Sequence, residues 1–371
     1  MKNYLFNNDR ILSRNRYPWV DYARGITIIL VVYRHVFEGL GEEVSAQYPS
    51  LEFFNAFFFS FRMPLFFMVS GLFFAQTFVR NGLPLYIKKR FSTIFYPLLI
   101  WGTIQVGLQL LLKNYVNADR EPIDFLNLLI KPREIEQFWY LNSLFFVGLL
   151  YALLTYYLKF QVKHQVFLGL ILFVSSGIIS YLMGLEGEYP WKLGFLYDVA
   201  YFYVFFALGD ALSKVVLNPQ NYQKLTSFKF LFLLLPVFII TQYFFTEINL
   251  NHKDDYYVQY RIPWFYIVAA IIGGALIILL SFLLEKFAIL KFLRVIGYHS
   301  LYIYASHLLV TAGTRIIFKN VLHIEYPPAI MVAGLFFGIV IPIVLYNLSV
   351  RNNFWWLFSS MPTPDVKRKS H

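Results

Sequence analysis

The stretch WFYIVAAIIGGALIILLSFLL, residues 264–284, decides the class of fold to which this chain belongs. It carries no charged side chain, and as a helix it is long enough to cross a bilayer core about 30 Å thick. Backbone N–H and C=O groups in hydrocarbon must bond to each other within the segment, which favours a helix. Its apolar residues run continuously instead of alternating, which argues against a strand of a membrane β-barrel.

Similar apolar runs recur along the whole chain of 371 residues. Hydrophobic residues make up 58% and charged residues only 14%, whereas a soluble domain has about 25% charged residues with which to cover its surface. We therefore predict an all-α, polytopic membrane helix bundle of about ten transmembrane helices. The expected spans are 19–38, 51–74, 91–112, 138–158, 165–183, 194–214, 229–246, 264–284, 298–318 and 328–348.

The basic residues indicate the orientation of these spans. With a cytoplasmic N-terminus, most of the 32 Lys and Arg residues fall in segments assigned to the inside, as the positive-inside rule requires. The formal charge of +11 is then mainly an orientation signal, and nucleic acid is not an expected partner. This gives a cytoplasmic N-terminal segment 1–18, a membrane domain 19–350 and a cytoplasmic tail 351–371. The longest outside connections, 113–137 and 247–263, either line an outward-facing site or are plain solvated loops.

The chain contains no cysteine, which excludes a thiolate nucleophile and a disulfide framework. The seven histidines are scattered and show no spacing typical of a zinc site. No metal is therefore expected.

The first span, WVDYARGITIILVVYRHVFEGL, contains ionisable residues that a membrane penalises. Arg24 and His35 are eleven residues apart, so they lie about 20° apart around a helix and about 16 Å apart along it. Asp21 shares this face and can pair with Arg24 at i+3. Arg34 points away and can pair with Glu38 at i+4. A purely structural ion pair is the alternative interpretation, but three such groups on one face favour an interior polar site.

Two further spans carry polar residues. In the ninth span, Tyr304, His307, Thr311 and Arg315 form a stripe that either lines a site or bonds neighbouring helices together. In the second span, Pro64 should interrupt the helix between Arg62 and Ser70, and a broken helix with polar residues usually faces a cavity.

Several of these segments resemble the signatures of the acyltransferase-3 family of bacterial membrane acyltransferases, which includes O-acetyltransferases of surface polysaccharides and a fucose 4-O-acetylase-like group. The similarity covers residues from about 20 to 310 in the order typical of the family. The matching segments are DYARGITIILVVYRHV (21–36), FRMPLFFMVSG (61–71), KKRFSTIFYPLLIW (88–101), FWYLNSLFFVGLLY (138–151) and KFLRVIGYHSLYIYASHLLV (291–310). Two positions depart from the family: Arg62 stands where many relatives have histidine, and the third segment lacks an Arg-x-x-Arg motif.

The resemblance implies transfer of an acyl group, expected to be acetyl, from cytoplasmic acyl-CoA to a hydroxyl of a cell-surface or lipid-linked glycan. It implies His35 as base or acyl carrier, supported by Arg24 and Asp21, because imidazole titrates near neutrality. Residues expected to bind the donor are Lys88, Lys89, Arg90, Arg62 and Ser70, although basic residues there also fit plain positive-inside charge. Residues expected in support are Trp139, Tyr304, His307 and Arg315.

The resemblance also implies a multi-pass protein of the bacterial inner membrane, with glycan-assembly proteins as partners. One alternative is a transporter or flippase of polysaccharide precursors, and another is a non-catalytic membrane scaffold. The sequence does not determine the acceptor sugar, the acyl chain or the oligomeric state.

Overall fold

A computed structural model describes residues 5–13, 17–41, 44, 47–113, 118–182 and 193–362. Every regular element in these ranges is a helix, which confirms the all-α prediction. Parts of the predicted cytoplasmic ends, residues 1–4, 14–16 and 363–371, lie outside the described residues.

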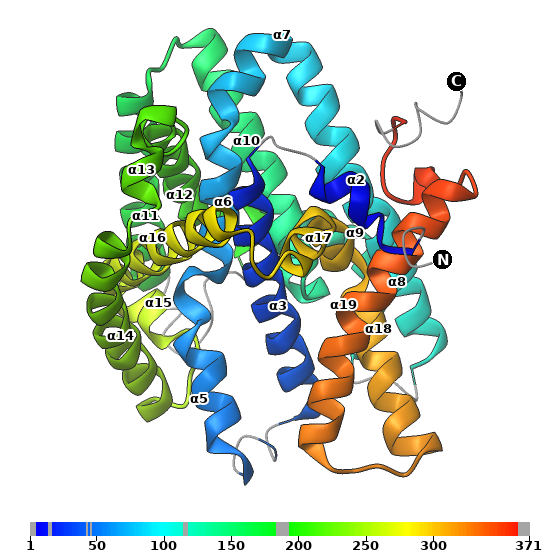
Figure 1. The fold of residues 1–371 in the computed structure, drawn as a ribbon. Helices are drawn as coiled ribbons and strands as arrows, with labels where there is room; N and C mark the ends of the chain where they lie inside the picture. The colour runs from blue at the N-terminus through cyan, green and yellow to red at the C-terminus, as the bar shows by residue number, and fades with distance from the viewer. Residues whose placement is uncertain are drawn as a thin grey trace.

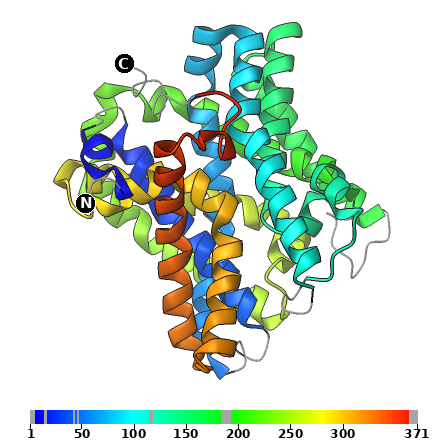
Figure 2. The same ribbon diagram turned by 90° about the vertical axis from the view of Figure 1, so that its right-hand side faces the viewer.

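Twelve long helices make up the body of the described chain (Figures 1 and 2). They are α3 (Pro18–Leu40), α5 (Pro49–Phe57), α6 (Phe59–Leu72), α7 (Phe74–Arg90), α8 (Tyr96–Leu111), α10 (Phe138–Tyr157), α11 (Val162–Leu182), α12 (Phe195–Val216), α14 (Phe228–Asn251), α16 (Pro263–Phe287), α18 (Ser300–Ile316) and α19 (Pro327–Arg351).

Short elements connect or extend them. The short α-helices are α2 (Asn8–Leu12), α9 (Asp124–Ile130), α13 (Tyr222–Leu225), α15 (Tyr257–Arg261) and α17 (Phe292–Tyr298). Two π-helices, η1 (Phe91–Phe95) and η5 (Ile317–Val321), lead into α8 and out of α18. The 3₁₀-helices are η2 (Pro132–Ile135), η4 (Pro219–Asn221) and η6 (Trp355–Leu357).

The predicted spans correspond to the long helices. Within the described residues, nine helical segments are long and apolar enough to cross a membrane, and they match the second to tenth predicted spans. The first predicted span is α3, which has 23 residues but carries Asp21, Arg24, Arg34 and Glu38. These charges set α3 apart from the plain apolar spans, and they agree with a position inside the bundle.

Helix α3 lies in the middle of the bundle. It packs against α6, α16, α17, α18 and α19, so its charged residues meet other helices instead of lipid. Figures 1 and 2 show α18 and α19 side by side next to α3, and α8 also contacts α18. By contrast, α11 and α14 keep many large apolar side chains exposed, as expected of helices that face lipid.

The second span is broken, but not where the sequence predicted. The interruption lies at Phe58, between α5 and α6, and Pro64 remains inside α6. Proline disturbs the turn before it, because it has no N–H and its ring crowds the carbonyl four residues earlier. The separation of α5 from α6 leaves backbone carbonyls at the end of α5 without helical partners.

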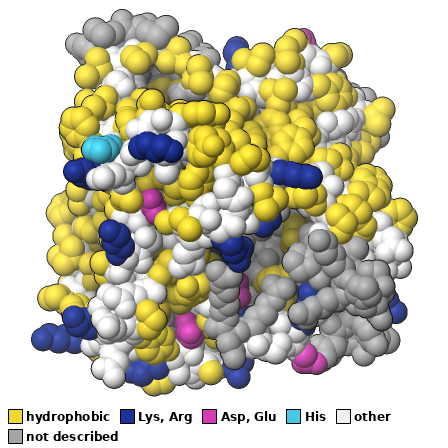
Figure 3. Space-filling model, turned by 90° about the horizontal axis from the view of Figure 1, so that it is seen from above, with side chains coloured by type: hydrophobic (Ala, Val, Ile, Leu, Met, Phe, Trp, Pro, Cys, Tyr) yellow, Lys and Arg dark blue, Asp and Glu magenta, His cyan; other side chains and the backbone are white. Residues whose placement is uncertain are grey.

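The segment before the third predicted span is a helix whose last turn carries Lys88, Lys89 and Arg90. It forms α7, which turns at Gly82, where φ is 67°. Helix α7 stands at the end of the molecule toward which α19 runs (Figure 1). Figure 3 looks at this end, and the side chains visible there include more basic than acidic ones. The picture agrees with the cytoplasmic face that the positive-inside rule assigns to this end.

Candidate active site

A cavity of about 500 Å³ lies beside the half of α3 that ends at Leu40. Its walls come mainly from α3, α6, α8 and α18 and from the two long connections that were predicted to lie outside, 113–137 and 247–263. The polar side chains among its lining residues are Arg34, His35, Glu38, Arg62, Gln109, Arg133, Glu136, Tyr256, Gln259, Tyr266, Tyr304, Thr311 and Arg315. Both connections therefore help to form the site.

His35 presents its imidazole to this cavity with one nitrogen fixed by a carboxylate. Its Nδ1 lies 3.4 Å from Oε2 of Glu38, one turn further along α3, and the His35 side chain is 18% exposed. No hydrogen bond to His35 Nε2 occurs within the described part of the chain. A carboxylate at Nδ1 favours the tautomer with its proton on that atom, which leaves the Nε2 lone pair free to accept a proton.

A second histidine packs against the first. The rings of His35 and His307 lie 5.1 Å apart between centroids. His307 is fully buried, and its Nδ1 lies 3.0 Å and 2.9 Å from the carbonyl oxygens of Ile303 and Tyr304. Because a carbonyl only accepts, Nδ1 of His307 carries the proton and its Nε2 is an acceptor. This Nε2 is buried and has no hydrogen-bond partner among the described residues.

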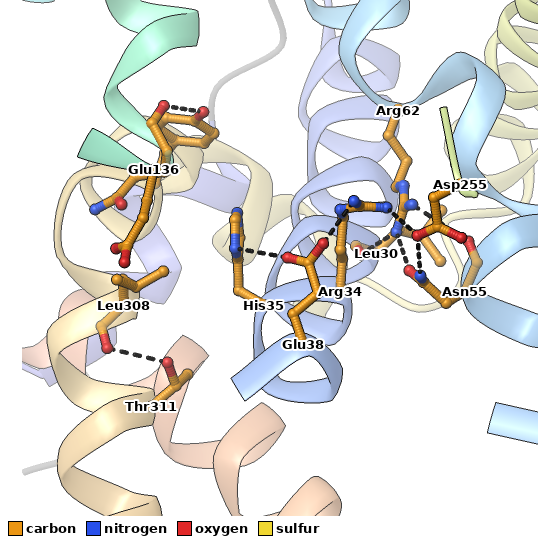
Figure 4. Close-up of polar contacts among 12 residues, drawn as sticks. Leu30, Arg34, His35, Glu38, Asn55, Arg62, Glu136, Asp255, Leu308 and Thr311 are labelled. Carbon is orange, nitrogen blue, oxygen red and sulfur yellow. Dashed lines mark hydrogen bonds and ion pairs between the residues drawn. The ribbon is translucent and has the colours of Figure 1, made fainter. Parts of the chain in front are cut away.

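Glu38 also belongs to a chain of charges that crosses from α3 to an outside connection (Figure 4). Arg34 lies 2.5 Å from Glu38 and 2.9 Å from Asp255, between its Nη2 and Nη1 atoms and the respective carboxylate oxygens. The Arg34–Glu38 pair predicted from the sequence is thus confirmed. Arg34 also donates to the Tyr256 hydroxyl at 3.1 Å and lies over the Phe59 ring, with 4.7 Å to the ring centroid.

Arg62 bridges the break in the second span. Its Nη1 donates to the Leu30 carbonyl at 3.1 Å and to Asn55 Oδ1 at 3.0 Å, and its Nη2 donates to the Asn55 carbonyl at 3.2 Å. Asn55 belongs to the last turns of α5, whose carbonyls lose their helical partners at Phe58. The Arg62 guanidinium therefore caps this broken end while it lines the cavity.

Glu136 faces His35 from the side opposite Glu38 (Figure 4). Its oxygens lie 2.9 Å from Gln105 Nε2, which donates to it, and 3.4 Å from Nη2 of Arg120. Burial raises the pKa of the Glu136 carboxyl above its usual range, and the positive charge of Arg120 opposes this only in part. Glu136 is near enough for its charge to act on His35.

The predicted supporting residues Trp139, Tyr304 and Arg315 all line the cavity. The Arg133 guanidinium lies over the Trp139 ring, with 3.9 Å to the ring centroid, and the Asp198 carboxylate holds Arg133 at 2.7 Å. Tyr304 donates from its hydroxyl to the Gln137 carbonyl, and Arg315 donates to the Gly39 carbonyl.

The structure does not bring Arg24 and Asp21 to this cavity. Both lie on α3, but neither is among the residues that line it. The rise of about 16 Å over eleven residues separates Arg24 from His35 even though they share a helix face. Arg24 and Arg90 are instead both near enough to act electrostatically on Tyr140. The polar side chains of α3 therefore form two layers. The inner layer lies around Arg24, and the outer layer lies around His35.

The residues expected to bind the donor lie in different settings. Lys88 is exposed, and Lys89 donates to Asn81 Oδ1 at 2.7 Å. Arg90 turns inward, where it donates to the Ser70 hydroxyl at 3.3 Å and to the Leu144 carbonyl at 2.8 Å. Of this group only Arg62 reaches the His35 cavity.

Sequence reasoning gave no role in the site to Glu136, Asp255 and Asn55, and it treated Glu38 only as a partner of Arg34. The position of Glu38 at i+3 from His35 was a usable signal. No local pattern connects Asp255 with Arg34, because 221 residues separate them. In the described ranges, no group of three or more His, Asp and Glu side chains could hold a metal ion.

The arrangement is suited to removing a proton from a hydroxyl in the cavity. A carboxylate orients one imidazole nitrogen, and the other nitrogen is available as a base, as in serine hydrolases. Comparison with protein families gave a match to an acyltransferase domain over residues 17–347. No match was found among curated proteins or among solved structures. The match covers almost the whole membrane domain, including every residue of the site, so the chain belongs to the acyltransferase-3 family and is a multi-pass membrane acyltransferase.

Proposed function

We propose that this protein transfers an acetyl or other acyl group from acyl-CoA to a hydroxyl of a cell-surface or lipid-linked glycan. The observation that carries the proposal is the His35 imidazole, oriented by Glu38 and open to a cavity in the outer layer of the bundle. The outside connections help to line this cavity, which suits an acceptor that arrives from outside.

In the direct route, His35 Nε2 takes the proton of the acceptor hydroxyl while its oxygen attacks the thioester carbonyl. The C–S bond then breaks, and the CoA thiolate leaves and receives a proton from the imidazolium. The developing oxyanion needs a positive neighbour, and the Arg62 guanidinium lines the same cavity.

In the relay route, His35 Nε2 attacks the thioester carbonyl itself and expels the CoA thiolate. The acyl-imidazole then gives its acyl group to the acceptor hydroxyl, and the hydroxyl proton passes to a nearby base. Glu136 and the unprotonated His307 Nε2 stand next to His35 and are suited to take that proton.

The inner polar layer is our candidate site for the donor. Arg24 and Arg90 face Tyr140 from different helices, and Ser70 binds Arg90. Lys88 and Lys89 lie at the end assigned to the cytoplasm and suit the phosphates of CoA, with Asp21 orienting Arg24. This scheme places the protein in a bacterial inner membrane, with acyl-CoA inside, the acceptor outside and glycan-assembly proteins as partners.

The test is transfer of labelled acetyl from acetyl-CoA into the glycan fraction of native membranes. We expect His35→Ala to abolish transfer, since none of the other described residues that line the cavity is a histidine. His164→Ala is the matched control, because His164 is an exposed histidine far along the chain on α11. Full transfer by His35→Ala would remove the central role of His35.

The two routes differ in whether the enzyme carries the acyl group. Labelled acetyl-CoA is added to purified protein without an acceptor, and the protein is then digested and examined by mass spectrometry. Acetyl on the His35 peptide supports the relay, and rapid transfer with no acetyl on that peptide supports the direct route.

A further inference from the structure

In the connection between α14 and α15, residues 252–256, the Asp255 carboxylate contacts the charged Arg34 of α3. Asp255 Oδ2 lies 2.9 Å from Arg34 Nη1 and accepts a hydrogen bond from Asn55 Nδ2 at 3.1 Å. Tyr256, the next residue, holds the other end of the same guanidinium through its hydroxyl. This outside connection therefore grips Arg34 at two atoms.

Arg34 is shared between two carboxylates that point to different parts of the molecule. Glu38 occupies Nη2 and Asp255 occupies Nη1, and the Arg34 side chain is only 11% exposed. Charge interactions at this level of burial are screened less than at an open surface. Glu38 is in turn the group that contacts His35 Nδ1. The position and charge of Arg34 thus bear directly on the carboxylate that orients the imidazole.

We infer that Asp255 is a positioning residue for the transfer reaction. It holds Arg34 in place and neutralises part of its charge, so that Glu38 stays available to His35 Nδ1 and Nε2 stays directed into the cavity. This inference rests on the proposed function of His35. It adds a requirement from an outside connection, far in sequence from the helix that carries the imidazole.

Among the described residues, six other charged or titratable groups lie around the pair formed by His35 and Glu38. They are Arg34 on α3, Arg62 on α6, Tyr256 beside Asp255, Glu136 before α10, and His307 and Arg315 on α18. Replacing Asp255 by Asn removes one negative charge and leaves the charges of these six groups unchanged. The surroundings of His35 then become more positive.

The sign of the expected pH effect follows from this change. A general base acts only in its unprotonated form, so transfer that depends on one falls at low pH. In Asp255→Asn the acidic limb of the transfer profile should move to lower pH, because removing a negative charge makes the site more positive and opposes the uptake of a proton. The rate on the plateau should fall roughly 10- to 100-fold, because Glu38 is drawn toward Arg34 and the imidazole loses its orientation.

The experiment measures acetyl transfer from labelled acetyl-CoA into the glycan fraction of native membranes across a pH series. Asp255→Asn should show the shifted acidic limb and the lower plateau rate, while the half-saturating acetyl-CoA concentration stays unaltered. Asp255→Glu should recover part of the rate. Asp254→Asn is the matched control: it removes the neighbouring charge, while Asp254 itself accepts the Tyr256 backbone N–H at 2.8 Å and asparagine retains that acceptor. It should keep the wild-type rate and pH profile.

A double substitution decides whether Asp255 acts through Glu38. If it does, Asp255→Asn combined with Glu38→Gln should be no slower than Glu38→Gln alone. Multiplicative losses, or a rate loss with an unmoved pH profile, would contradict the inference. If Asp255→Asn is recovered poorly, Asp255→Ser serves in the same comparison. Failure of the proposed function is a separate result, because His35→Ala would then transfer as well as the wild type.

Discussion

At the scale of single residues, Arg62 shows how a charge is tolerated in the interior of this bundle. A charged side chain at the centre of a transmembrane helix costs about 2.5–3.5 kcal/mol on insertion scales. Arg62 is only 3% exposed, but it donates to two backbone carbonyls and to one side-chain amide. The carbonyl of Asn55 needs such a donor because α5 ends two residues later. The guanidinium therefore supplies donors to the carbonyls at the break, and these carbonyls supply acceptors to the buried charge.

Arg62→Met should lower the stability of the protein by roughly 3 kcal/mol, because it leaves these buried acceptors without a donor. The stability of Arg62→Lys should lie between those of the wild type and Arg62→Met, since one ammonium group cannot reproduce the planar fork of a guanidinium. The measurement is thermal unfolding in detergent, followed by tryptophan fluorescence. Arg80→Met, at an exposed arginine on α7, is the control and should unfold like the wild type. Equal unfolding temperatures for Arg62→Met and Arg80→Met would contradict this account.

The sequence predicts part of this residue chemistry and misses part of it for a physical reason. The Arg34–Glu38 pair follows from helical spacing, which is a local property. His35 stands out because an ionisable group in an apolar span needs an explanation. Asp255 has no such signal, since an aspartate in an outside connection is ordinary. Its role depends on how α14 and α15 pack against α3, which no local pattern determines.

At the scale of elements, α3 and the short α17 approach each other unusually closely. A Cβ added at Gly25 would overlap the Leu293 carbonyl, and a Cβ added at Gly297 would overlap the Asp21 carbonyl. Small residues allow helix backbones to come this near in membranes. The contact fixes the half of α3 that carries Asp21 and Arg24, so it also determines where the inner polar layer lies.

Gly297→Ala should therefore force the two helices apart and destabilise the protein by about 1–3 kcal/mol. Gly107→Ala is the matched control, because the space around Gly107 on α8 is open. There alanine should be neutral or stabilising by up to about 1 kcal/mol, since it is the better helix former. Unfolding temperatures of both variants in detergent provide the measurement. A Gly297→Ala protein as stable as Gly107→Ala would show that the approach is not required.

The helices that could be predicted from the sequence are those marked by a long apolar run. Spans such as α16 and α19 follow from uninterrupted hydrophobic runs. Helix α7 did not, because its segment is charged and contains Gly82 and Pro84, which are typical of loops. Likewise, Pro64 drew attention to the wrong residue in the second span. Proline acts on the turn before it, and Arg62 stabilises a break at Phe58 that the sequence does not mark.

At the scale of the whole molecule, the two polar layers fit a reaction whose donor and acceptor lie on opposite sides of the membrane. The inner layer around Arg24, Arg90 and Tyr140 lies toward the end that carries α7. The outer layer around His35 is lined in part by the outside connections. This arrangement serves a cytoplasmic donor and an external acceptor only if the chain has the orientation inferred from its basic residues.

The absence of cysteine from the chain allows this orientation to be tested directly, because a single introduced thiol is the only one present. Asp119→Cys places a thiol in the first long outside connection, at a side chain that is 82% exposed. The substitution removes an exposed pair with Lys113, and such pairs contribute little to stability. Lys163→Cys places a thiol at an exposed position in the first turn of α11, on the face assigned to the cytoplasm.

A maleimide reagent that cannot cross the membrane should label Asp119→Cys in intact cells. It should label Lys163→Cys only after the cells are permeabilised, because the thiol then faces the inside. The cysteine-free parent controls for labelling of other groups, and transfer activity in each variant shows that its fold is retained. The reverse pattern would invert the bundle and place His35 on the cytoplasmic side. An external acceptor would then have no access to the imidazole, and the assignment of donor and acceptor to opposite faces would have to be abandoned.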